Sequence, residues 1–132
     1  MSTLISWFDE ANRILMLKLQ EQWTWTDLRE ALHEAHAITM PHTERTDYFL
    51  DVRDSSLLPD GAIHQVRAIA SEVPPNWGVS VVLQDSLFVK VMVQAVARLN
   101  PELATRFPLA DTIEEGLALI EQSRAQSGIA AA

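Results

Sequence analysis

The stretch "WGVSVVLQDSLFVKVMVQAVARL", from Trp77 to Leu99, decides the fold. Its first eight residues are rich in valine and apolar on both faces, which predicts a buried strand. Asp85 or Ser86 can then cap a helix. Inside that helix "FVKVMV" alternates as a strand would, but the length and the continuing pattern favour a helix that ends at Asn100-Pro101. A buried strand followed by a helix is the repeating unit of an α/β fold.

The same succession of strands and helices runs along the rest of the chain. The further predicted elements are strands at 4–10, 13–19, 48–52 and 105–110 and helices at 24–40, 61–73 and 111–126. The order β-β-α-β-α-β-α-β-α predicts an α/β domain with a mixed, mostly parallel five-stranded sheet and covering helices. We expect a single domain over 1–126 and a flexible tail over 127–132.

The composition excludes several classes of function. The 132 residues fit one globular domain, and the lack of cysteine excludes disulfides, thiolate metal sites and cysteine nucleophiles. The N-terminal residues do not form a secretory signal, and no apolar run approaches the roughly 20 residues that span a bilayer. A net charge of −8 with scattered basic residues argues against nucleic-acid binding. We therefore expect a cytoplasmic protein without a membrane span.

Two motifs invite a catalytic or metal-binding interpretation, and both fall short of it. His33 and His36 are three residues apart, whereas the zincin helix needs histidines four apart, so we predict exposed polar residues and no metal. Ser55-Ser56 lacks the flanking glycines of a serine-hydrolase turn. No glycine-rich nucleotide loop is present, so we expect no cofactor.

An enzyme without a recognisable motif stays open as an alternative. Asp51, Asp54 and His64 are then the only plausible acid/base set in the sequence. A second alternative is a carrier of a small apolar or lipid-like ligand, in a pocket walled by Trp23, Trp25 and Met40. Without a ligand, the two tryptophans would be explained by packing at the start of a helix.

The helix from Ser86 to Asn100 has more apolar positions than one buried stripe needs. If Phe88, Met92 and Leu99 face the sheet, a second apolar stripe faces away from it. Either the C-terminal segment or a second copy of the chain would cover this stripe, and we expect a homodimer through it. The residues of the stripe are Val89, Val93 and Ala97.

The element order, with "YFLDV" before a polar corner and "WGVSVVLQ" before a long helix, resembles the STAS-like family of anti-sigma-factor antagonist-like, or SpoIIAA-like, domains. The ending "RFPLADTIEEGLALIEQ" is similar to the last strand and helix of that family. The resemblance covers nearly the whole chain and rests on topology and pattern. It implies a non-enzymatic bacterial regulatory domain that binds a protein partner or a small ligand.

In that family a switch serine follows the third strand, in an Asp-Ser-Ser-Gly sequence at the start of the second helix. Laying the end of "YFLDV" on the family's strand places Pro59-Asp60-Gly61 there, so the hydroxyl group is missing. The resemblance then implies a surface without the usual phosphoserine switch, although Ser55 and Ser56 nearby could still be modified. The candidate partner-binding residues are Arg53, Asp54, Ser55, Ser56, Asp60 and Gly61.

Overall fold

The computed structural model describes residues 3–20, 22–39, 41, 44–54, 61–71, 76–99 and 101–131. Strands and helices alternate after an opening strand pair. The elements are β1 Thr3–Asp9, β2 Ile14–Gln20, α1 Trp25–Thr39, β3 Thr46–Asp54, α2 Ala62–Ser71, β4 Trp77–Leu83, α3 Leu87–Leu99, α4 Pro101–Arg106, β5 Leu109–Ala110 and α5 Ile113–Ala131. Within the described ranges, no helix combines the length and the apolar character that crossing a bilayer requires.

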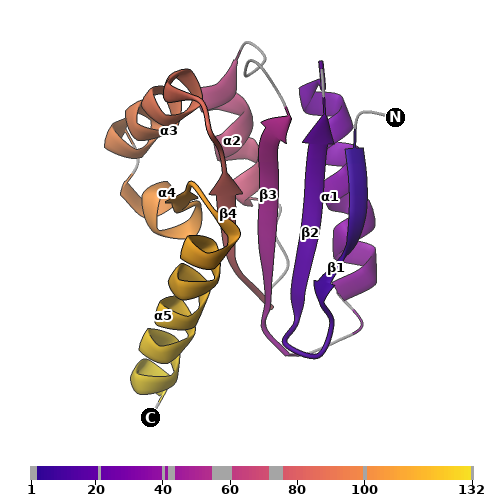
Figure 1. The fold of residues 1–132 in the computed structure, drawn as a ribbon, viewed down its shortest axis with the longest axis vertical. Coiled ribbons are helices and arrows are strands. Elements are labelled where there is room, and N and C mark those ends of the chain that lie inside the picture. Colours follow the sequence, from indigo (N-terminus) through magenta and orange to yellow (C-terminus); the bar gives the residue numbers. More distant parts are fainter. Residues whose placement is uncertain are drawn as a thin grey trace.

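The strands form one sheet in the order β1-β2-β3-β4-β5 (Figure 1). β1 runs antiparallel to β2, and each later pair of neighbours is parallel. Because every right-handed crossover moves to the next strand in the same direction, the crossover helices lie on one face of the sheet. The prediction of an α/β fold with a mixed, mostly parallel five-stranded sheet is confirmed.

The two faces of the sheet are covered differently. On one face, which we call the α5 face, Phe49 and Val81 pack against Ile120 of α5. The opposite face packs Val52 and Val82 against α1, α2 and α3, through Leu28, Ile69 and Val89 respectively. Figure 1 shows α5 in front of β4 and α1 behind β1 and β2. No described helix lies in front of β1, and its Leu4, Ser6 and Phe8 are exposed, so the α5 face of this strand is left open.

Two helices begin at threonine caps whose hydroxyl oxygens accept from a backbone N–H group of the first turn. At α1 the Thr24 hydroxyl oxygen accepts from the Asp27 amide at 3.1 Å, and the Asp27 carboxylate accepts from the Thr24 amide at 2.9 Å. At α5 the Thr112 hydroxyl oxygen accepts from the Glu115 amide at 3.1 Å. Thr24 is therefore the cap of α1, and Thr112 is the cap of α5.

The predicted orientation of α3 is wrong. Val89 is only 1% exposed and lies in the core, and Val93 is half-buried against the same core. Among the described side chains of the helix, the large apolar ones that are exposed are instead Leu87 and Val91, at 77% and 53%. Val89, Val93 and Ala97 do share one face, but a helix that is apolar nearly all round carries no signal for which face turns inward.

The end of the chain also differs from the prediction. Thr105 and Arg106 belong to a short helix, α4, and the last strand is reduced to the two residues Leu109–Ala110. α5 continues through Ala131, into the stretch for which the sequence predicts a flexible tail. The mobility of 127–132 stays a prediction.

Candidate functional site

The carboxyl end of β3 holds a buried ion pair. Asp51 is 2% exposed, and its two oxygens accept from Arg53 Nε at 3.0 Å and Nη2 at 2.9 Å. The backbone amide of Arg53 donates to the same carboxylate at 3.0 Å. The two residues meet because side chains two positions apart in a strand lie on one face of the sheet. The planar fork of Arg53 therefore fixes the carboxylate in a bidentate geometry.

These contacts determine the protonation state of the pair. Burial acts to raise the pKa of Asp51, but the hydrogen bonds from the Arg53 side chain and amide, with the charges of Arg53 and Lys18, outweigh it. The pKa of Asp51 is therefore lower than its ordinary value. The hydrogen bond to Asp51 raises the pKa of Arg53 in turn. Both groups are charged throughout the physiological range.

A second ion pair lies beside the first and is open to solvent. Lys18 Nζ on β2 is 3.1 Å from Asp54 Oδ2, with side-chain exposures of 37% and 54%. Lys18 is also the β2 residue in register with Asp51. Two carboxylates and two cations thus alternate across the ends of β2 and β3.

The carboxyl end of β4 adds a polar turn that leads into α3. Gln84 is 2% exposed; its amide nitrogen donates to Asp111 Oδ1 at 2.7 Å, and its oxygen accepts from the Ser86 amide at 3.0 Å. Asp85 is exposed, and its charge contributes to the raised pKa of Arg53, so the two strand ends share one electrostatic environment. The exposed Leu87 and Val91 follow directly on α3.

We call this region the carboxyl-edge surface. It comprises Arg53, Asp54, Asp85, Leu87 and Val91. Ligands of α/β proteins commonly bind at the carboxyl ends of the parallel strands. The surface comprises an exposed apolar pair on α3 and a charged corner in which Arg53 and Asp54 are held by ion pairs, and Asp85 links the two through its charge.

The structure describes only some of the remaining predicted site residues. Gly61 is exposed with a φ of 86°, the left-handed region that favours glycine, and its carbonyl accepts from the Gln65 amide at 3.0 Å as α2 begins. Ser55, Ser56 and Asp60 lie outside the described residues. His64 is exposed on α2, and no hydrogen bond or ion pair joins it to Asp54 in the part of the chain that the structure describes.

The tryptophans expected to wall a ligand pocket pack against each other. Trp23 is 4% exposed in the core, and its ring meets that of Trp25 edge-on, with centroids 5.0 Å apart. Met40 lies outside the described residues. The carrier of a small apolar ligand stays a prediction.

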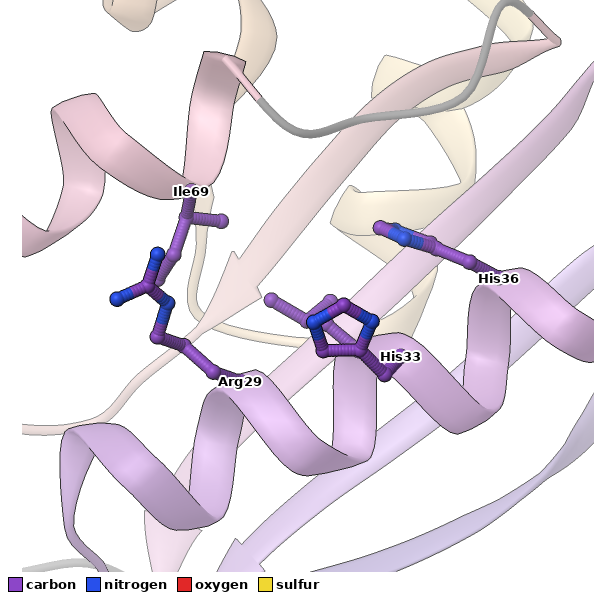
Figure 2. A pocket seen from close by; sticks show the side chains of 5 residues that line it. Arg29, His33, His36 and Ile69 are labelled. Atoms are coloured by element: carbon purple, nitrogen blue, oxygen red, sulfur yellow. The ribbon is translucent and has the colours of Figure 1, made fainter.

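A shallow groove that the sequence did not predict lies between α1 and α2 (Figure 2). Arg29, His33 and His36 of α1 point towards it, and Leu32 and Ile69 complete its lining. Its cavity volume is about 10 Å³, room for roughly one water molecule. The spacing i, i+4, i+7 in the sequence was the only signal that these side chains share a side of the helix. The described residues contain no group of three or more potential metal ligands.

A second buried carboxylate, also not predicted, lies at the amino end of β3. Asp47 is 0% exposed and accepts from Arg45 Nε and Nη2, at 3.1 and 3.0 Å, and from the Val79 amide at 2.8 Å. Its other oxygen accepts from Arg124 Nε of α5 at 2.6 Å. Gly78 leaves room for these contacts, because a Cβ at that position would overlap the Asp47 carboxylate. Asp47 therefore ties β3, β4 and α5 together.

Comparison with known proteins identifies no relative. No known protein family matches the chain, and neither the curated proteins nor the solved structures include a match to it. The fold and the site define an α/β domain with a polar carboxyl edge.

Proposed function

We propose that the chain is a non-catalytic regulatory or protein-interaction domain of STAS-like type, and that it binds a protein partner through the carboxyl-edge surface. The observation that carries the proposal is the exposure of Leu87 and Val91, at 77% and 53%, on the helix that follows Asp85, whose charge acts on Arg53 of the ion-paired end of β3.

The chemistry of this surface suits a protein partner. Protein interfaces commonly combine an apolar centre with a polar and charged rim. Leu87 and Val91 lie one helical turn apart and supply the apolar part, while Arg53, Asp54 and Asp85 supply the rim. Because Asp51 holds Arg53 in a bidentate pair, less side-chain freedom is lost when a partner binds.

The electrostatics of the corner favour binding over acid/base catalysis. A general base that works at neutral pH needs a pKa near the working pH. The pKa of Asp51 is instead lowered by Arg53, which makes this carboxylate a weak base. Asp54 is engaged with Lys18. The proposed lack of a phosphoserine switch rests on the sequence at 59–61, and cytoplasmic location also stays a prediction.

The proposal is tested by affinity capture from an extract of the source cell, with the tagged chain as bait. The double variant Leu87→Glu, Val91→Lys removes the apolar pair without changing the net charge, and its i, i+4 charge pair supports the helix. Ile38→Lys is the matched control, since Ile38 is an apolar residue of α1 that is 41% exposed.

We expect one protein to be captured by the unaltered chain and by the control, and about tenfold less of it by the double variant, a loss of about 1.4 kcal/mol. Equal capture by all three baits would contradict the proposed surface. A tightly held metabolite in place of any protein partner would overturn the proposed function itself.

A further inference from the structure

We propose that the outer edge of β1 pairs with β1 of a second copy, in antiparallel orientation, and joins the two five-stranded sheets across a two-fold axis. The proposal is independent of the carboxyl-edge surface, because it uses the opposite part of the sheet from α3. It rests on the unequal protection of the two sheet edges, on the lack of charge from Thr3 to Phe8, and on the symmetry of the residue pattern of β1.

The two edges of the sheet differ in length and protection. The β5 edge is two residues long, and short edge strands are one of the ways in which proteins avoid edge-to-edge association. The β1 edge is seven residues long, and no described strand pairs with its outer side. Its unpaired backbone N–H and C=O groups therefore form a template for a further strand.

The residues of β1 lack the usual protection against such pairing. Thr3 to Phe8 contain no charged residue and no proline, which are the devices that commonly block an edge. An irregularity in the pairing with β2 falls between Trp7 and Asp9, so the ladder from Thr3 to Trp7 remains regular. In a chain of net charge −8, this uncharged run lets two copies approach with Asp9 of each strand opposite Thr3 of the other, so that acidic side chains are not brought together.

The pattern of β1 is symmetric about Ser6, the midpoint of the strand. Apolar residues stand one and two positions away on both sides, and polar residues end the strand at both ends. A two-fold axis at Ser6 places Leu4 opposite Phe8 of the second copy, and Ile5 opposite Trp7 of the second copy. Cross-strand pairs of aromatic and aliphatic residues stabilise antiparallel strands.

This register also accounts for two exposed apolar side chains. Leu4 and Phe8 are 50% and 37% exposed on the open α5 face, where the Phe8 ring meets Phe49 edge-on at 5.0 Å. In the paired strands Leu4 of each copy lies beside Phe8 of the other copy. A strand from an unrelated protein would not be expected to match this symmetry, so we assign the edge to a second copy.

The test uses the lack of native cysteine. Ser6 is exposed, and Ser6→Cys places a single thiol on the proposed axis. Residues directly opposite each other in antiparallel strands have Cβ atoms about 5 Å apart, close to the separation of roughly 4 Å in a disulfide. Ser71→Cys, at an exposed position of α2, is the matched control.

We expect Ser6→Cys to form a covalent dimer under mild oxidation at protein concentrations where Ser71→Cys stays largely monomeric. Light scattering should show the mass of the unaltered chain doubling as the concentration rises through the micromolar range. Ser6→Lys should lower the dimer fraction at least about tenfold, because lysine blocks sheet edges, whereas Ser71→Lys should leave it unchanged. Circular dichroism confirms that each variant is folded.

A mass that stays monomeric at every concentration overturns the proposal. So does a dimer in which Ser6→Cys crosslinks no better than Ser71→Cys, since the strands would then not meet at Ser6. Occupation of β1 by a different protein, with no self-association after its removal, would also overturn it.

Discussion

Replacement of Asp47 by asparagine is the sharpest test of what holds this fold together. Asp47→Asn keeps the side-chain volume and removes the negative charge. The Asn oxygen can still accept from the Val79 amide, but its NH₂ group then faces the Nε–H of Arg124, donor against donor. Arg45 loses its charged partner as well.

The expected loss follows from the burial of the groups. Removing one partner of a buried ion pair costs about 3–5 kcal/mol, because the remaining charge is left uncompensated. Here the carboxylate is 0% exposed, but Arg45 and Arg124 keep 25% and 31% of their side-chain surface and can be partly rehydrated. We therefore expect a loss of about 2–4 kcal/mol in the free energy of unfolding, or roughly 10 °C in Tm for a domain of this size.

Urea unfolding followed by circular dichroism measures the loss, and an unchanged m-value shows that the unfolding reaction is the same. Asp54→Asn is the control, because it makes the same chemical change in a pair that is 37% and 54% exposed. We expect this control to lose less than about 1 kcal/mol. A loss below about 1 kcal/mol for Asp47→Asn, or equal losses for both variants, would refute the role given to Asp47.

Three further predictions concern the packing and the titration of single residues. Gly116→Ala should lower the free energy of unfolding by about 1–3 kcal/mol, and Tm with it, because the added Cβ would overlap the Phe49 ring. Replacing glycine by alanine in a helix usually raises Tm, and such a rise here would contradict the expected overlap. The pKa of Asp51 is lower in the folded chain than its unfolded value of about 3.9. Asp51 therefore contributes to the free energy of unfolding above that unfolded pKa, and the contribution is lost as the pH falls through the folded pKa. The stability difference between the unaltered chain and Asp51→Asn should then be constant from about pH 8 to 6 and shrink below about pH 4 in urea titrations; growth on acidification would rule this out. Burial raises the pKa of Tyr48, the single tyrosine of the chain. The absorbance of its phenolate should therefore appear at higher pH in the folded chain than in the chain unfolded in urea. Titration at the same pH in both states would disprove the burial of Tyr48.

The order and type of the main elements could be predicted from the sequence because they depend on local signals. The valine-rich run at Trp77, the turn residues before each helix and the Thr112 cap act within a few residues of the chain. The short helix after Pro101 was missed because its six residues carry no amphipathic pattern long enough to recognise.

Only those parts of the site that are formed by residues close together in the sequence could be predicted. Arg53 and Asp54 follow an apolar run, and that position is visible in the sequence. The network around Asp47 was not, since Arg124 lies 77 residues away and nothing in the sequence pairs them. The direction in which Val89 points was likewise undetermined, because it depends on how α3 packs on the sheet and not on the periodicity of the helix.

The two buried carboxylates of β3 differ in a way that bears on function. Asp47, at the amino end, receives donors from Arg45 just before β3, from Val79 of β4 and from Arg124 of α5, so the amino edge of the sheet is held partly by long-range contacts. Asp51, at the carboxyl end, is held by Arg53 two residues away, and Arg53 keeps 33% of its side-chain surface exposed. A local pair can exchange its partner without unfolding the domain, whereas a network joining three elements cannot. The rigid amino edge therefore supports a carboxyl edge whose charged side chains remain able to engage a partner.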